Sequence, residues 1–272
     1  FMFTSAFVVA FALTLFAGLS TGIGSALAFF TKRTNTKFLS VALGFSAGVM
    51  IYISFTEMLM EGQRLLIELY TPRLGMTFAV TAFFVGMFLA ALIDRLVPHE
   101  ENPREMHHIE EMSDKKEAER QRKLLRLGII AALAIGLHNL PEGLATFVAA
   151  INDLKLGVAI ALAIAIHNIP EGIAISIPIY YATGSKIKAF KYSFLSGLAE
   201  PIGALIGCLV ICNFFDENLA TGFLFPAVAG IMVFISLDQL LPAAREYGEH
   251  HLSIYGLVAG MAIMAFSLIL FV

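Results

Sequence analysis

Long apolar runs of about twenty residues recur along this chain, and short charged segments separate them. A run of that length crosses a membrane as an α-helix, whereas the strands of a membrane β-barrel are shorter and alternate apolar with polar residues. Only 14% of the residues are charged, against roughly 25% in a soluble domain. The pattern therefore predicts an all-α, polytopic membrane protein without a separate soluble domain.

Eight such runs are present, and we expect each to form one transmembrane helix of a single domain over residues 1–272. The first run is interpreted as a retained span, because no basic segment precedes it. The expected helices, numbered 1 to 8 in chain order, cover about residues 5–29, 38–60, 76–97, 124–149, 156–181, 188–212, 221–242 and 252–272.

Lys and Arg are distributed unevenly among the connecting segments. The loops that follow odd-numbered helices contain 15 of them, and the loops that follow even-numbered helices contain 3. Because positively charged loops remain in the cytoplasm, both chain termini are predicted to face outward. The longest loop, at about residues 98–123, is then cytoplasmic.

Two of the apolar runs contain the same polar motif. Residues 132–148 read ALAIGLHNLPEGLATFV and residues 161–177 read ALAIAIHNIPEGIAISI, so that ten of the seventeen positions are identical. In each copy the His and the Glu are four residues apart and project from one helix face. Pro141 and Pro170 each loosen the preceding turn, which is tolerated at membrane depth where the backbone is buried or lines a wet cavity.

Two further pairs of similar segments link the two ends of the chain. Residues 47–59 match residues 229–241, and residues 18–26 match residues 197–205 more weakly. These matches relate helix 2 to helix 7 and helix 1 to helix 6, which cross the membrane in opposite directions. We therefore predict inverted repeats of helices 1–3 and 6–8 around a central pair, helices 4 and 5. Such repeats are typical of transporters, although seams of small residues also resemble one another by chance.

Polar and acidic side chains lie near the middle of helices 4, 5 and 6. An ionised carboxylate at the bilayer centre costs about 3 kcal/mol on insertion scales, and no Lys or Arg occurs near these positions. The imidazoles, amides and carboxylates form a mixed ligand set that suits Zn²⁺, Fe²⁺, Mn²⁺, Co²⁺ or Cd²⁺. We predict a metal site, and a seam of interhelical hydrogen bonds is the alternative. The candidate ligands are His138, Asn139, Glu142, His167, Asn168, Glu171 and Glu200.

The motifs HNLPEG (138–143), HNIPEG (167–172) and GLAEPIGA (197–204) resemble those of the ZIP family of metal transporters, in particular its bacterial zinc and iron permeases. The resemblance covers essentially the whole chain. It implies uptake of divalent metal through the cytoplasmic membrane of a bacterium, with no resident cofactor. We expect alternating access, in which helices 4 and 5 move against a scaffold of helices 1–3 and 6–8.

The family also implies a site for two metal ions between helices 4, 5 and 6. One position would take the His and Glu of both motifs, and the second would take both motif Asn side chains and Glu200 while sharing the two Glu. Some relatives carry Asp where this chain has Asn168, so the neutral amide is expected to weaken or broaden the second position. Met50 is the candidate for a further ligand from helix 2, and packing is its alternative role.

Three acids near helix ends form a second group of candidates for the metal pathway. Glu57 lies near the outer end of helix 2, and Asp94 and Asp238 lie near the inner ends of helices 3 and 7. The alternative is that they are interfacial charges that reach water. Because the central ligands must be deprotonated to bind metal, uptake is expected to weaken as pH falls.

Two other functions use the same residue types. A membrane-embedded metal hydrolase would also need His, Glu and metal, but the HExxH motif of a metalloprotease helix is not in the sequence. A passive divalent-cation channel would use the same ligands as a carrier. No basic block suggests nucleic acid, so the expected partners are metal ions and the lipid bilayer, and the assembly stays open between monomer and homodimer.

Overall fold

The structure is a computed structural model that describes residues 5–29, 36–96, 117–214, 217–247 and 250–269. The regular structure of these residues is entirely helical, which confirms the predicted all-α class. Two short π-helical segments, η1 and η3, interrupt longer helices. The elements are α1 (Ser5–Ala28), α2 (Thr36–Ile53), η1 (Ser54–Met58), α3 (Leu59–Leu69), α4 (Pro72–Leu96), α5 (Glu117–Asn152), α6 (Leu154–Thr183), α7 (Lys186–Gly197), α8 (Ala199–Phe214), α9 (Glu217–Ile235), η3 (Ser236–Leu240), α10 (Leu241–Tyr247) and α11 (His250–Ile269).

The second predicted helix does not end near residue 60, because α2 continues through η1 into α3. The mean hydropathy falls in α3 because this helix contains charged residues. Among them, Arg64 is exposed and forms ion pairs with Glu61 and Glu68, both at 2.6 Å. Leu65 and Leu66 on the other face are buried against α9. An amphipathic helix therefore extends the apolar span at one end of the molecule.

Two other predicted boundaries differ from the structure. The sixth predicted helix, 188–212, is interrupted at Leu198, where α7 ends and α8 begins. Residues 117–123, which the sequence assigns to the long loop, already belong to α5. The rest of that loop, at residues 98–116, lies outside the described residues, as does residue 97 at the end of the third predicted helix.

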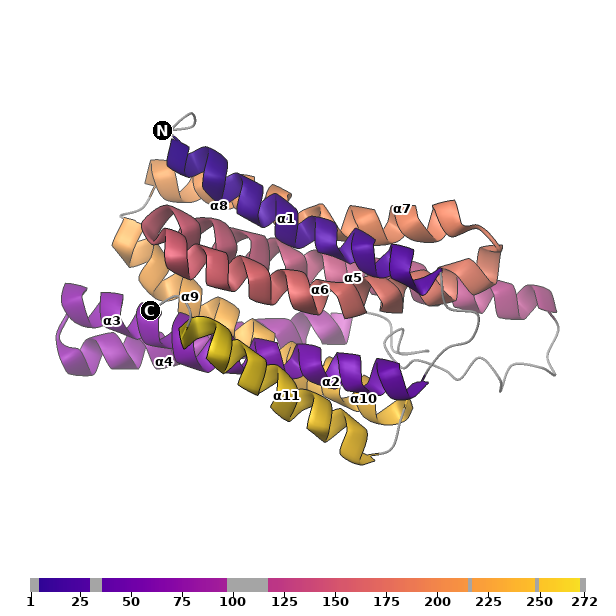
Figure 1. Cartoon of the computed structure of the whole chain (residues 1–272). Helices are drawn as coiled ribbons and strands as arrows, with labels where there is room; N and C mark the ends of the chain where they lie inside the picture. Colours follow the sequence, from indigo (N-terminus) through magenta and orange to yellow (C-terminus); the bar gives the residue numbers. More distant parts are fainter. Residues whose placement is uncertain (1–4, 30–35, 97–116, 215–216, 248–249, 270–272) are drawn as a thin grey trace.

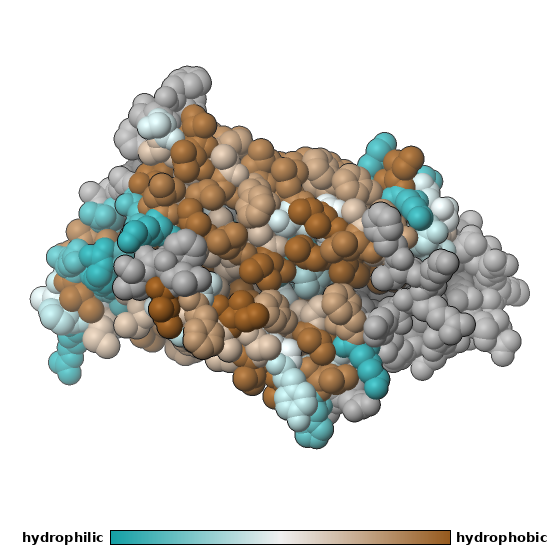
Figure 2. Space-filling view, in the orientation of Figure 1, coloured by the Kyte–Doolittle hydropathy of each residue, from teal (hydrophilic) through white to brown (hydrophobic). Residues whose placement is uncertain are grey.

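Seven helical segments among the described residues are long and apolar enough to cross a membrane. The predicted fourth span, within α5, is not among them. Figure 2 shows an apolar surface over the middle of the visible face and hydrophilic residues near the two ends. The start of α1 and the end of α11 lie at the same end of the molecule (Figure 1). These observations indicate a multi-pass membrane protein.

The helices form two bundles (Figure 1). The first bundle consists of α1, α5, α6, α7 and α8, and the second consists of α2 to α4 with η1 and α9 to α11 with η3. The predicted scaffold of helices 1–3 and 6–8 is therefore wrong, because α1, α7 and α8 pack against α5 and α6. Glycines explain this packing: a Cβ on Gly24 would overlap the Ile169 carbonyl, and a Cβ on Gly203 would overlap the Leu140 carbonyl.

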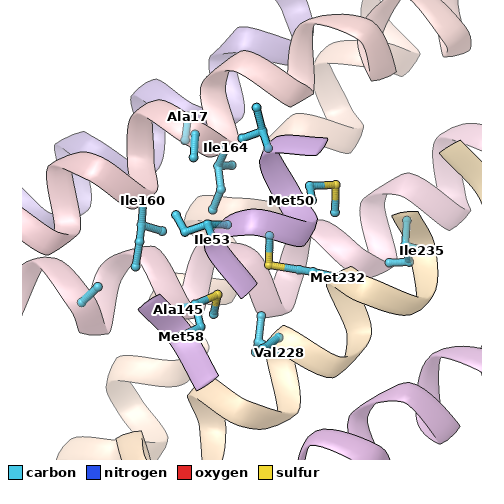
Figure 3. Close-up of a cluster of buried hydrophobic side chains, with 14 of the residues drawn as sticks. Ala17, Met50, Ile53, Met58, Ala145, Ile160, Ile164, Val228, Met232 and Ile235 are labelled. Atoms are coloured by element: carbon cyan, nitrogen blue, oxygen red, sulfur yellow. The ribbon is translucent and has the colours of Figure 1, made fainter. Parts of the chain in front are cut away.

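The two bundles meet along a seam of buried apolar side chains (Figure 3). Ile160 and Ile164 of α6 face Met50 of α2 and Met232 of α9 in this region. A hydrogen bond from Asn152 Nδ2 to Thr221 Oγ1, at 3.4 Å, also joins α5 to α9. The contact between the bundles is thus largely hydrophobic and non-directional.

Candidate metal centre

The predicted ligands come from three helices of the first bundle. α5 and α6 each carry one HNxPEG motif and continue through the proline of that motif. α8 contributes Glu200 in its first turn, directly after the interruption at Leu198. A carboxylate in the first turn of a helix is favoured by the unpaired backbone N–H groups there. Interrupted helices at membrane depth are found where the backbone lines a site or is buried in protein.

Six of the predicted ligands have described side chains, and all six are almost completely buried. Their exposed fractions are between 0 and 2%. Residues 127–152, 156–183 and 192–214 contain no Lys or Arg that could neutralise the acids. The buried polar side chains are Asn139, Glu142, His167, Asn168, Glu171 and Glu200.

A direct contact between the two motifs joins α5 to α6. The distance from His167 Nε2 to Glu142 Oε2 is 3.3 Å, and both side chains are buried. The second carboxylate oxygen of Glu142, Oε1, has no hydrogen-bond partner among the described residues. An imidazole nitrogen and a carboxylate oxygen at this distance are suitable ligands for one cation.

The two asparagine amides are held by backbone carbonyls of neighbouring helices. Asn139 Nδ2 donates to the Ser196 carbonyl oxygen of α7 at 3.2 Å, and Asn168 Nδ2 donates to the Ala17 carbonyl oxygen of α1 at 2.9 Å. Because each NH₂ group is held by a backbone carbonyl, the Oδ1 atom of the same amide points away from that carbonyl. Within the described part of the chain, neither Oδ1 atom has a hydrogen-bond donor.

Glu200 connects α8 to this group. Its Oε1 accepts a hydrogen bond from Asn168 Nδ2, and its Oε2 has no partner among the described side chains. Electrostatic interactions link Glu200 with Glu142 and with Glu171. Three acids from three helices thus lie close enough to repel one another, which is costly in a low-dielectric interior without a cation or protons.

The close approach of these helices depends on glycine at two motif positions. A Cβ on Gly143 would overlap the backbone carbonyl of Glu200, and a Cβ on Gly172 would overlap the carbonyl of Thr21. The last residue of each HNxPEG motif therefore brings α5 against α8 and α6 against α1. Small residues are typical of such close contacts between membrane helices.

The remaining candidates lie outside this cluster or outside the described side chains. The backbone of His138 is on α5, one turn before Glu142, but its side chain is not described. Met50 is fully buried in the seam of Figure 3. Glu57 lies in η1, and Asp94 Oδ1 of α4 accepts a hydrogen bond from Gln239 Nε2 of η3 at 3.5 Å, next to Asp238. These three acids lie in the second bundle, whereas the central cluster lies in the first.

The described side chains do not yet form a closed ligand set, since no three His, Cys, Asp or Glu groups among them are arranged as a metal site. They nevertheless fit a cation chemically. Four buried acceptor oxygens have no partner in the described structure: Asn139 Oδ1, Glu142 Oε1, Asn168 Oδ1 and Glu200 Oε2. Buried oxygens of this kind are costly unless a donor or a cation binds them.

Sequence reasoning missed the carbonyls that orient the two amides and the interruption before Glu200. Gly197 and Pro201 around Glu200 were available as signals of an irregular helix. The carbonyls of Ala17 and Ser196 carry no side-chain signal, so only the packing of α1 and α7 against the motifs identifies them.

A profile of the family described as ZIP Zinc transporter matches residues 95–268. The zinc transporter ZupT of Nitratidesulfovibrio vulgaris is 59% identical over 270 residues, which cover 97% of each chain. The proteins of the same name from Streptococcus mutans and Clostridium perfringens are 58% and 55% identical, with 97% of this chain covered in both cases and 97% and 96% of theirs.

Proposed function

The chain belongs to the ZIP zinc transporter family, and from this premise we propose that it carries divalent metal ions, zinc first, across a membrane through the centre between α5, α6 and α8. The observation that carries the proposal is the set of buried acceptor oxygens of Asn139, Glu142, Asn168 and Glu200 that have no partner among the described residues. A travelling cation supplies the positive charge that these acids lack. A resident polar seam would instead satisfy its own hydrogen bonds.

We propose two metal positions in this centre. The contact between His167 and Glu142 supports the first position, which His138 and Glu171 would complete. The amide oxygens of Asn139 and Asn168, together with Glu200, would form the second. The mixed nitrogen and oxygen ligands suit zinc, and Fe²⁺, Mn²⁺, Co²⁺ and Cd²⁺ are the further expected substrates.

We further propose eight membrane spans related by inverted repeats, with α5 as the span that composition alone does not identify. Reciprocal contacts support the repeat: a Cβ on Gly18 would overlap the Gly197 carbonyl, and a Cβ on Gly197 would overlap the Gly18 carbonyl. The π-helical segments η1 and η3 begin at Ser54 and Ser236, which the alignment of the matched segments equates.

The orientation follows from the charge distribution, with the Lys- and Arg-rich loops in the cytoplasm and both termini outside. The relatives named above are bacterial proteins, which supports a bacterial cytoplasmic membrane. A homodimer stays a prediction, and chemical cross-linking in the membrane tests it.

The mechanism we propose is alternating access by displacement of the first bundle against the second. All proposed ligands except Met50 lie in the first bundle, so the cation would move together with its ligands. The seam between the bundles is apolar and non-directional, so the displacement breaks few specific interactions. This replaces the scaffold of helices 1–3 and 6–8 that the sequence suggests.

The two rival functions make different predictions. The relatives are named transporters, which leaves the hydrolase without support, and product formation by purified protein without a membrane would restore it. A channel would conduct without saturation at rates above those of a carrier. Purified protein in liposomes, loaded with a zinc indicator, separates these cases by the dependence of the initial rate on zinc concentration.

The direct test is uptake of radioactive zinc into such liposomes, with competing Fe²⁺, Mn²⁺, Co²⁺ and Cd²⁺. Saturable zinc uptake that the Glu142→Gln variant lacks supports the proposal. Normal uptake by this variant, inserted at the same level, would contradict the site.

A further inference from the structure

Thr21 lies in α1 with a fully buried side chain, and its hydroxyl has no hydrogen-bond partner among the described residues. Six other threonines donate to the carbonyl four residues before them, as is usual in membrane helices. The corresponding acceptor for Thr21, the Ala17 carbonyl, binds the amide of Asn168 instead. The six bonded threonines are Thr14, Thr56, Thr77, Thr81, Thr146 and Thr183.

The internal alignment of the sequence pairs Thr21 with Glu200. The register that matches residues 18–26 to residues 197–205 also equates Ala17 with Ser196. The carbonyls of Ala17 and Ser196 hold Asn168 and Asn139, which the two HNxPEG motifs equate in turn. The repeat therefore makes the same contact twice, as Ala17 with Asn168 and as Ser196 with Asn139. Asn168 also binds Glu200, so the repeat places Thr21, the counterpart of Glu200, beside Asn139.

Backbone contacts give independent support for this placement. A Cβ on Gly18 would lie 3.4 Å from Glu200 Cβ, and a Cβ on its counterpart Gly197 would lie 3.0 Å from Thr21 Oγ1. The Thr21 hydroxyl is thus next to Gly197, and Gly197 directly follows the residue whose carbonyl fixes Asn139. Asn139 Oδ1 is also without a described partner.

We propose that Thr21 is a metal-binding residue of the central site, with its hydroxyl oxygen across from Glu200 and directed to the second metal position or to a water bound there. This inference rests on the proposed function. One carboxylate and one neutral hydroxyl then face each other across that position. The position carries less negative charge than two acids would give it, which favours weak binding and release of the second ion.

Equilibrium binding of Zn²⁺ to the purified full chain in detergent tests the role without transport. We expect two bound ions in the wild type and in Thr21→Ser, which keeps the hydroxyl. Thr21→Val has the same shape without it, and we expect the second dissociation constant to rise about tenfold while the first is unchanged. The matched control is Thr14→Val, in the same helix, whose buried hydroxyl is bonded to the Ala10 carbonyl at 3.0 Å.

Each outcome decides the question. If the Thr21→Val variant binds both zinc ions with the same dissociation constants as Thr14→Val, the proposal is overturned. If Thr21→Val does not fold, by thermal unfolding in the same detergent, Thr21→Ala takes its place, and equal weakening of both ions then indicates a structural role and also overturns it. Glu200→Gln is measured in parallel: if it too leaves the second ion unaffected, the proposed two-position site fails, whereas an effect of Glu200→Gln alone removes only the role of Thr21.

Discussion

The two bundles bury different kinds of polar group. All four buried acidic or histidine side chains in the described structure, which are Glu142, His167, Glu171 and Glu200, lie in the first bundle. The buried polar groups described in the second bundle are hydroxyls of Ser and Thr. Ser54 and Ser236, for example, donate to carbonyls four residues earlier at 2.7 and 2.8 Å.

Both bundles use glycine to bring helix backbones together. A Cβ on Gly143 would overlap the Glu200 carbonyl in the first bundle, and a Cβ on Gly230 would overlap the Phe83 carbonyl in the second. Small-residue seams therefore indicate helix packing in either bundle and do not identify function. Among the described residues, buried acids distinguish the first bundle, because an ionised acid at this depth requires a cation or protons to neutralise it.

The largest expected effect comes from removing one acid of the first bundle. Glu142→Gln keeps the size of the side chain but removes its charge, so we expect zinc uptake to fall at least about a hundredfold. Uptake of radioactive zinc into liposomes, normalised to inserted protein, measures the loss.

The matched control is Glu68→Gln in the second bundle, an exposed acid that pairs with Arg64. Exposed ion pairs contribute little, about 0–1 kcal/mol, so this variant should transport zinc normally. Equal loss in both variants would show that the distinction between the bundles has no functional meaning.

The two glycine contacts separate packing from function. Gly143→Ala and Gly230→Ala should each lower the stability of the protein by about 1–3 kcal/mol, because a backbone carbonyl must move away. Only Gly143→Ala displaces Glu200, so we expect its uptake per folded chain to fall about tenfold, equivalent to about 1.4 kcal/mol. Thermal unfolding and uptake are measured on the same samples. A comparable decrease per folded chain in Gly230→Ala would refute the assignment.

Glu200→Gln tests the two-position arrangement within the first bundle. Glu200 accepts from Asn168 and is not in hydrogen-bond contact with His167 in the described structure, so zinc uptake should be retained in part. The relative uptake of Mn²⁺, Fe²⁺ and Cd²⁺ should change several-fold, on the order of 1 kcal/mol in metal preference. Competition between each metal and radioactive zinc provides the measurement. An equal decrease for every metal argues against two separate positions.

Much of the architecture follows from the sequence because membrane helices leave a strong signal. Apolar runs predict the helices, and the HNxPEG motifs predict that Glu142 and His167 share a site, which their 3.3 Å contact supports. The amphipathic α3 and the interruption at Leu198 were not predicted, since the charged residues of α3 end the apolar run and Leu198 is itself an apolar residue within the predicted helix.

The grouping of helices could not be predicted because it depends on which glycine faces which backbone. Gly24 and Gly203 occur in segments that the repeat identifies, but their partners Ile169 and Leu140 are apolar residues like many others. The role of Thr21 was hidden for a similar reason. A threonine in a membrane helix usually bonds to its own helix, and only the structure reveals that this one does not.

The smallest effect concerns the seam between the bundles, where Met50 and Met232 occupy equated positions of the matched segments. Both are fully buried, so Met50→Leu and Met232→Leu should each cost less than about 1.5 kcal/mol of stability. If Met50 also offers its thioether sulfur to the first metal, Met50→Leu should raise the dissociation constant for zinc about threefold, while Met232→Leu leaves it unchanged. Zinc binding to the purified proteins measures this difference. Identical constants in both variants would mean that Met50 only packs, and that every ligand of the cation belongs to the first bundle.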